Sequence, residues 1–173
     1  MVEETGIRFE LTVDGEKQLD RALSRGGDHL SDVSPFFEVA ADMIAGFVEL
    51  QFDTQGGRTG GWAPLSPQYA AWKFAQVGAQ PIMVFTGRLK RSLVERGANN
   101  IREISPDRMR WGTSIKTAKD APYPIFHQRG GRGERPPQRR IIDLTENDRN
   151  ALMKALQRFI LGDPEEFGLE IPR

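Results

Sequence analysis

The chain has 173 residues, carries 24 acidic and 24 basic side chains, and contains no cysteine. This length is typical of one domain that buries roughly 70% of its unfolded surface, and zero net charge gives no whole-molecule attraction to nucleic acid or membrane. The lack of cysteine excludes disulfide frameworks and thiolate metal sites, and no apolar run approaches the ~20 residues that span a bilayer, so we expect a soluble protein made in the cytoplasm.

The first predicted elements are a strand and a short helix. Apolar and polar residues alternate from Ile7 to Val13, which is typical of a half-buried strand. Residues 16–25 then carry one apolar helical face and end at Gly26-Gly27.

A long amphipathic helix is predicted next, and we expect it to be the spine of the fold. Ser34-Pro35 offers an N-cap oxygen followed by proline at the first helical position. Apolar residues recur at three- and four-residue spacing from Phe36 to about Phe52. The four glycines between Gln55 and Gly61 predict a flexible loop, and their spacing matches no nucleotide-binding fingerprint.

Three more helices and a hairpin follow. Ser66-Pro67 repeats the capping pattern before a helix that ends near Gly78, and Thr86 is predicted to cap the next. The last helix starts at a capping box of Thr145 and Asp148 and ends at Gly162. A turn at residues 105–107 lies between the strands of the predicted hairpin.

These elements predict an α+β fold. We expect a small, mostly antiparallel sheet packed by about four helices, with long mobile loops. Residues 1–162 are assigned to one domain and residues 163–173 to a C-terminal tail.

An arginine-rich loop is the main candidate site. Its arginines are Arg129, Arg132, Arg135, Arg139 and Arg140. We expect them to be exposed, because burying unpaired guanidinium groups is costly, and anchored basic loops often form binding surfaces. They could bind carboxylates of another subunit, or DNA phosphates, or remain solvated without a partner. We rank a protein partner ahead of the DNA backbone.

The aromatic residues and the histidine allow two interpretations each. Trp62, Tyr69 and Trp72 could form an exposed recognition patch, but their spacing favours the core; Arg58 and Trp62 are nevertheless added to the candidate interface. His127 lacks the partner residues of a hydrolase or a metal site, so we interpret it as structural, hydrogen-bonded near a turn. We expect no catalysis, no cofactor and no metal.

Four ordered motifs together resemble the phage virion-morphogenesis, or tail-completion, family of Mu-like and P2-like phages, which is related to neck proteins. The motifs lie at residues 52–66, 85–93, 122–130 and 137–148. Two departures are Pro124, where alanine is expected, and Arg140-Ile141-Ile142, where Pro-Phe-Leu is expected.

The resemblance implies a non-enzymatic structural protein that completes the tail and joins it to the DNA-filled head. It further implies a homo-oligomeric ring, a hexamer or dodecamer, that contacts neighbouring neck, tail-terminator or tail-tube proteins and no membrane, with packaged DNA as a further contact. Such a protein is made in the bacterial host cytoplasm and resides in the virion. A nucleic-acid-binding module that uses the arginine loop is the alternative.

Overall fold

The computed structural model describes residue 27 and residues 31–118, 120–131, 133 and 136–161. Within these ranges the chain forms five α-helices, one 3₁₀ turn and a two-stranded antiparallel sheet. The predicted α+β class with a small antiparallel sheet is therefore confirmed. The predicted strand 7–13, the predicted helix 16–25 and the tail 163–173 lie outside the described residues.

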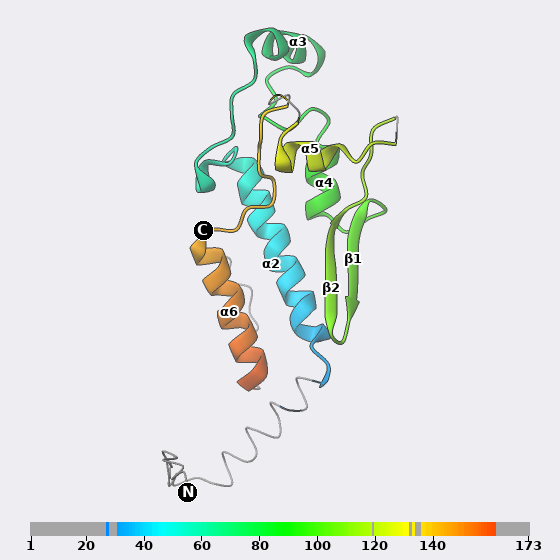
Figure 1. Cartoon of the computed structure of the whole chain (residues 1–173), viewed down its shortest axis with the longest axis vertical. Helices are drawn as coiled ribbons and strands as arrows, with labels where there is room; N and C mark the ends of the chain where they lie inside the picture. Colours follow the sequence, from blue (N-terminus) through cyan, green and yellow to red (C-terminus); the bar gives the residue numbers. More distant parts are fainter. Residues whose placement is uncertain (1–26, 28–30, 119, 132, 134–135, 162–173) are drawn as a thin grey trace, which may run out of the picture.

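Helix α2 (Ser34–Asp53) is the element on which α4, α6 and the hairpin pack, as expected for the spine of the fold (Figure 1). Helix α6 (Glu146–Leu161) lies along one side of it, and helix α4 (Arg88–Val94) and the hairpin contact it from another. Its apolar periodicity is used as expected, because Phe36, Ala40 and Phe47 are buried.

Two apolar clusters form the core, and α2 contributes to both. Near its carboxyl-terminal end, Val48 and Phe52 pack with residues of α4 and with Ile141. Near its amino-terminal end, Phe36 and Ala40 pack with Phe159 of α6. The apolar stripe of one helix thereby holds together segments from most of the described chain.

The hairpin is formed as predicted and is joined to α2 by charges. Strands β1 (Asn100–Ser105) and β2 (Arg108–Thr113) pair antiparallel. Arg102 of β1 donates to Glu38 Oε2 at 2.6 Å and also to the carboxylate of Asp42, both on α2. The hydrogen bond from Arg102 to the Asp42 carboxylate lowers the pKa of Asp42.

The predicted helix starts are right at two positions and wrong at two. Ser66 accepts from the backbone N of Tyr69, and Thr145 and Asp148 form the reciprocal capping box. Ser34 is instead the first residue of α2, and its N–H and hydroxyl both donate to Asp32. Thr86 does not cap α4, since the N-cap is Gly87 in the left-handed conformation.

Helices α3 (Pro67–Val77) and α5 (Tyr123–Arg129) lie toward the end of the molecule where α2 ends, with α3 at the tip (Figure 1). Irregular segments connect and support them there. We call this region, made of residues 54–87 and 116–145, the loop end. It contains every described residue of the candidate interface.

Candidate functional site

The glycine loop at residues 55–61 is a closed, hydrogen-bonded turn that contains the 3₁₀ turn η1 (Gly57–Thr59). The Gly56 N–H donates to Gln51 O at 2.8 Å, and the Trp62 N–H donates to Gln55 O at 2.9 Å. Gly56 has a φ of +79°, and a Cβ there would lie 2.5 Å from Trp62 Cδ1, so only glycine fits. The sequence predicted a flexible loop, whereas these residues form a defined turn in the single subunit.

Arg58 is held within the subunit. Its guanidinium donates to Asp148 Oδ1 on α6 and, at 3.2 Å, to the carbonyl of Phe47 on α2. Asp148 is buried, and its other oxygen accepts from the Thr145 N–H. One carboxylate therefore caps α6 and fixes Arg58, which makes this predicted interface residue a structural link between the glycine loop and two helices.

The carbonyl of Arg140 is the point where the glycine loop and the arginine loop meet. Trp62 Nε1 donates to it at 2.9 Å and Gln51 Nε2 at 3.2 Å, while Gln51 Nε2 also reaches Thr59 Oγ1 at 2.7 Å. Trp62 is buried and packs edge to face on Phe52. The core position favoured for Trp62 is confirmed, and its side chain is not a free contact surface of the single subunit.

Arg139 contradicts the expectation that the arginines are exposed, because only 5% of its surface is accessible. Its Nε donates to Ala63 O at 2.8 Å and its Nη2 to Pro64 O at 3.0 Å. These two carbonyls accept from two of the five guanidinium N–H donors, and no carboxylate among the described residues forms a salt bridge with Arg139. Burial in turn lowers the pKa of Arg139.

Gln128 of α5 anchors the second half of the arginine loop. Its Oε1 accepts from the N–H groups of Ile141 and Ile142, and its Nε2 donates to Ile142 O at 2.8 Å. The backbone N–H of Gly131 donates to Pro136 O at 2.9 Å and closes the loop at its base. The predicted anchoring of the arginine loop at both ends is confirmed.

The remaining interface candidates divide into two groups. Arg129 is exposed, and the Arg140 side chain is 58% exposed beside Asp143. Arg132 and Arg135 lie outside the described residues. Among the described arginines of the loop, Arg129 and Arg140 are thus the ones whose side chains are exposed to solvent.

Tyr69 and Trp72 are exposed, so the expectation that they belong to the core is wrong. They lie on α3 at the tip of the molecule, where Trp72 stacks on Phe85 with ring centroids 5.6 Å apart. Tyr69 packs against Trp72, with ring centroids 5.4 Å apart. The three rings form a small exposed aromatic group that the helical spacing alone did not reveal.

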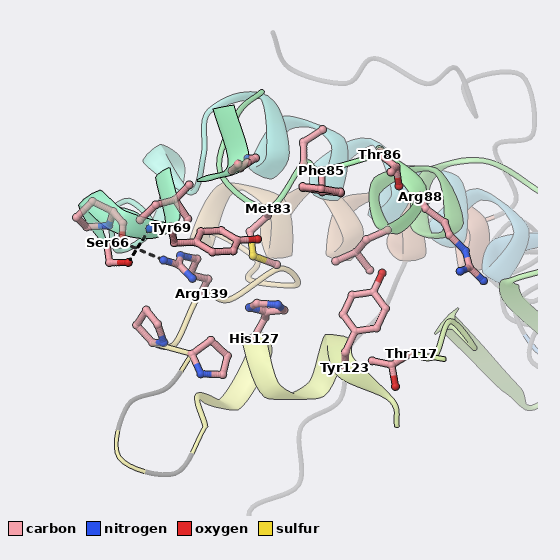
Figure 2. A pocket seen from close by; sticks show the side chains of 18 of the residues that line it. Ser66, Tyr69, Met83, Phe85, Thr86, Arg88, Thr117, Tyr123, His127 and Arg139 are labelled. Atoms are coloured by element: carbon pink, nitrogen blue, oxygen red, sulfur yellow. Dashed lines mark hydrogen bonds between the residues drawn. The ribbon is translucent and has the colours of Figure 1, made fainter. Parts of the chain in front are cut away.

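An open cleft of about 1260 Å³ lies beside this aromatic group, between α3, the start of α4 and α5 (Figure 2). His127 and Tyr123 point into it from α5, and Arg139 lies on its floor. Its described lining also includes Lys73, Arg88 and Lys116, and no aspartate or glutamate is among these described residues. It is therefore a cationic cleft with largely apolar walls.

Two of the groups in the cleft are unusually placed for ionisable side chains. Lys73 is buried and donates to the carbonyl of Gln80 at 3.0 Å, and burial lowers its pKa. The Nδ1 atom of His127 is buried and has no hydrogen-bond partner among the described residues. This nitrogen therefore does not make the hydrogen bond predicted for the side chain. Burial, with a further contribution from Arg139, lowers the pKa of His127 and favours the neutral imidazole.

No protein-family model, no curated protein and no solved structure matches this chain.

Two further observations limit what the described residues can do. They contain no group of three histidine, cysteine, aspartate or glutamate side chains that could hold a metal ion. Among their helices, none combines the length and the apolar composition required for crossing a membrane.

Several residues that build the loop end were given no individual role from the sequence, although one of them lies in the third motif. They are Gln51, Lys73 and Gln128, and each binds backbone carbonyls or amides through a polar side chain. Gln51 reaches a loop far away in the sequence, whereas Lys73 binds the segment that directly follows its own helix. A signal existed for Gln51, because it stands at an apolar position of the predicted α2 face, where an amide must find a partner. Lys73 and Gln128 gave no comparable signal, since their partners are backbone groups.

Proposed function

We propose that this chain is a non-enzymatic structural component of the head–tail junction of a tailed phage or phage-like particle, where copies assemble into a ring. The resemblance of its ordered motifs to the tail-completion family motivates the proposal. The observation that carries it is the way in which those motifs meet in space, although they lie far apart in the sequence.

Contacts among the motif segments are direct. Trp62, from the first motif, donates to the carbonyl of Arg140 in the last. Arg139 returns two hydrogen bonds to Ala63 and Pro64 of the first motif. The third motif joins through Gln128, whose side chain holds Ile141 and Ile142. Residues of three of the four motifs thus form one hydrogen-bonded unit, which supports the proposal.

The exposed surface supports an assembly role. A ring that closes by rotation needs two different surfaces on each subunit, one for each neighbour. The loop end offers the Tyr69–Trp72–Phe85 group, formed by α3 and the segment before α4, and Phe126 on α5, all of them large apolar side chains exposed to solvent. Exposed aromatic groups of this kind are typical of the centre of protein interfaces.

A DNA-binding module is the competing proposal, and the fate of the arginines weakens it. Arg139 is hydrogen-bonded to carbonyls of its own subunit, and Arg58 is hydrogen-bonded to Asp148. Fewer guanidinium groups are thus free for phosphate contacts, and each lost contact lowers the affinity and its salt dependence.

The two proposals are separated by the purified protein itself. Electron microscopy and sedimentation should show closed rings of one stoichiometry, with duplex DNA bound weakly or not at all at physiological salt. A monomer that binds duplex DNA tightly, with a steep loss of affinity as salt rises, would overturn the assembly proposal in favour of the DNA-binding one.

A loop variant tests the role in the particle. Replacing Arg132 and Arg135 with glutamate should block joining of heads to tails and leave the melting temperature of the subunit unchanged. A matched change on the hairpin, Arg108→Glu and Arg110→Glu, should leave joining intact. Normal infectious particles from the loop variant would contradict an assembly role for the arginine loop.

A further inference from the structure

The cationic cleft beside α3 has the properties of a peptide-binding site. Its cations lack carboxylate partners among the described residues, with the exception of Lys116, which pairs with the exposed Asp120 at 2.8 Å. Lys73 and Arg139 are buried, and each donates hydrogen bonds to backbone carbonyls. Arg88 is exposed at the start of α4. Uncompensated positive charge within apolar walls favours a ligand that is both anionic and apolar.

The chain itself contains a segment of this composition. Residues 162–173 follow α6 and carry four acidic side chains, Asp163, Glu165, Glu166 and Glu170. Phe167, Leu169 and Ile171 stand at alternate positions among them, which places all three on one side of an extended peptide. The acidic groups suit the cations of the cleft, and the apolar ones suit its aromatic and proline walls.

We infer that the cleft of one subunit binds segment 162–173 of a second copy. This inference rests on the proposed function, because it names the contact that would link neighbouring subunits of the ring.

The geometry favours a second copy over the same chain. The carboxyl-terminal end of α6 lies at the end of the molecule opposite to α3, and residues of α3 line the cleft (Figure 1). A segment that returned along the 16 residues of α6 would first cover about 24 Å. At about 3.4 Å per residue, this path would use up residues 162–168, including most of the acidic groups, before it drew level with Glu146.

A contact between opposite ends also has the right symmetry. The donor end of one subunit, after α6, would meet the acceptor end of the next, at α3, and the two surfaces are different. Such a head-to-tail contact closes into a ring when the rotation between subunits allows it.

The test is the binding of a fluorescent peptide of residues 162–173 to the full-length chain, measured by anisotropy at concentrations at which the chain sediments as single subunits, so that no neighbour occupies the cleft. We expect saturable binding that weakens as salt rises, because part of the attraction is between exposed charges. Arg88→Glu should weaken binding roughly tenfold. This substitution suits the fold, since an acidic side chain is favourable in the first turn of a helix. Arg108→Glu, on the hairpin away from the cleft, is the matched control and should bind like the parent.

A charge-swapped peptide gives the decisive reading. Peptide with Glu165→Lys and Glu166→Lys should bind the parent chain weakly and the Arg88→Glu chain better, which a general loss of folding could not produce. Absence of binding, or equal binding to the Arg88→Glu and Arg108→Glu chains, would overturn the inference. So would a short single-stranded oligonucleotide that occupies the cleft while the peptide does not.

Failure of this inference is distinguishable from failure of the proposed function. Rings that form normally from the Arg88→Glu chain, with no peptide binding to the parent, would overturn the cleft contact alone. Peptide binding with charge-swap rescue, together with particles that join heads to tails without this chain, would overturn the proposed function and leave the contact standing.

Discussion

The two ends of the molecule are held together by different interactions. Around α2, apolar side chains at helical spacing bury one another, as Phe36 and Ala40 do with Phe159. At the loop end, polar side chains bind backbone carbonyls of distant loops, as Arg139 does with Ala63 and Pro64. The comparison shows how loops far apart in sequence can be fixed without a large apolar core of their own, which leaves the aromatic residues of α3 available to solvent.

We call α2, α4, α6 and the hairpin the apolar body. The largest expected effect on stability comes from a substitution in this body. Phe47 is 2% exposed on α2, so Phe47→Ala should lower the free energy of unfolding by about 3–5 kcal/mol. Phe74→Ala is the control, because that ring on α3 is 65% exposed and its loss should cost less than about 0.5 kcal/mol. Urea denaturation of both variants checks this, and equal midpoints would show that α2 is not the spine.

A smaller effect is expected at the loop end. Arg139→Ala removes both donors from the carbonyls of Ala63 and Pro64 and should cost about 1–3 kcal/mol. Arg140→Ala should be almost neutral, since Arg140 contributes its backbone carbonyl and its side chain is largely exposed. Denaturation midpoints that rank the two neighbours in the opposite order would refute the role assigned to the buried guanidinium.

The same contrast explains how much of the fold could be predicted. The body follows from local rules: apolar periodicity gives α2, and the capping box of Thr145 and Asp148 gives the start of α6. The hairpin follows from the turn signal at residues 105–107. Each of these signals lies within a few residues of the structure that it specifies.

The loop end could not be predicted in this way. Every residue carries a backbone carbonyl, so the sequence cannot show which residues accept hydrogen bonds from a buried guanidinium. For this reason the sequence suggested that Arg139 was solvated. Four glycines suggested flexibility, whereas Gly56 adopts a positive φ beneath Trp62 in a closed turn. Helical spacing suggested a buried face for Tyr69 and Trp72, but no element packs over that face of α3 in the described subunit.

A pH-dependent effect is expected at His127, in the cleft. Its pKa in the folded chain is lowered by burial and by Arg139, whereas the unfolded chain titrates near the ordinary value of 6.5. The unfolded state therefore takes up protons first as the pH falls below 6.5, and the folded state loses stability. His127→Phe should reduce this loss, which thermal melts between pH 7.5 and 5 would reveal. Identical pH profiles for parent and variant would contradict the assignment.

The smallest effect is expected where the body itself relies on charge. Arg102 lowers the pKa of Asp42 in the folded state, so the carboxylate stabilises the fold above the ordinary value of 3.8, and this contribution is lost as the pH falls through the lowered pKa. Asp42 is 40% exposed, and solvent screening should keep the cost of Asp42→Asn below about 1 kcal/mol at pH 7. The difference from the parent should shrink in acid, while Glu95→Gln, an exposed change at the end of α4, should give none at either pH. Asp42→Asn could instead lower the free energy of unfolding as much as Arg139→Ala does. Polar contacts would then be as important for the apolar body as for the loop end, which would contradict the contrast drawn between these two regions.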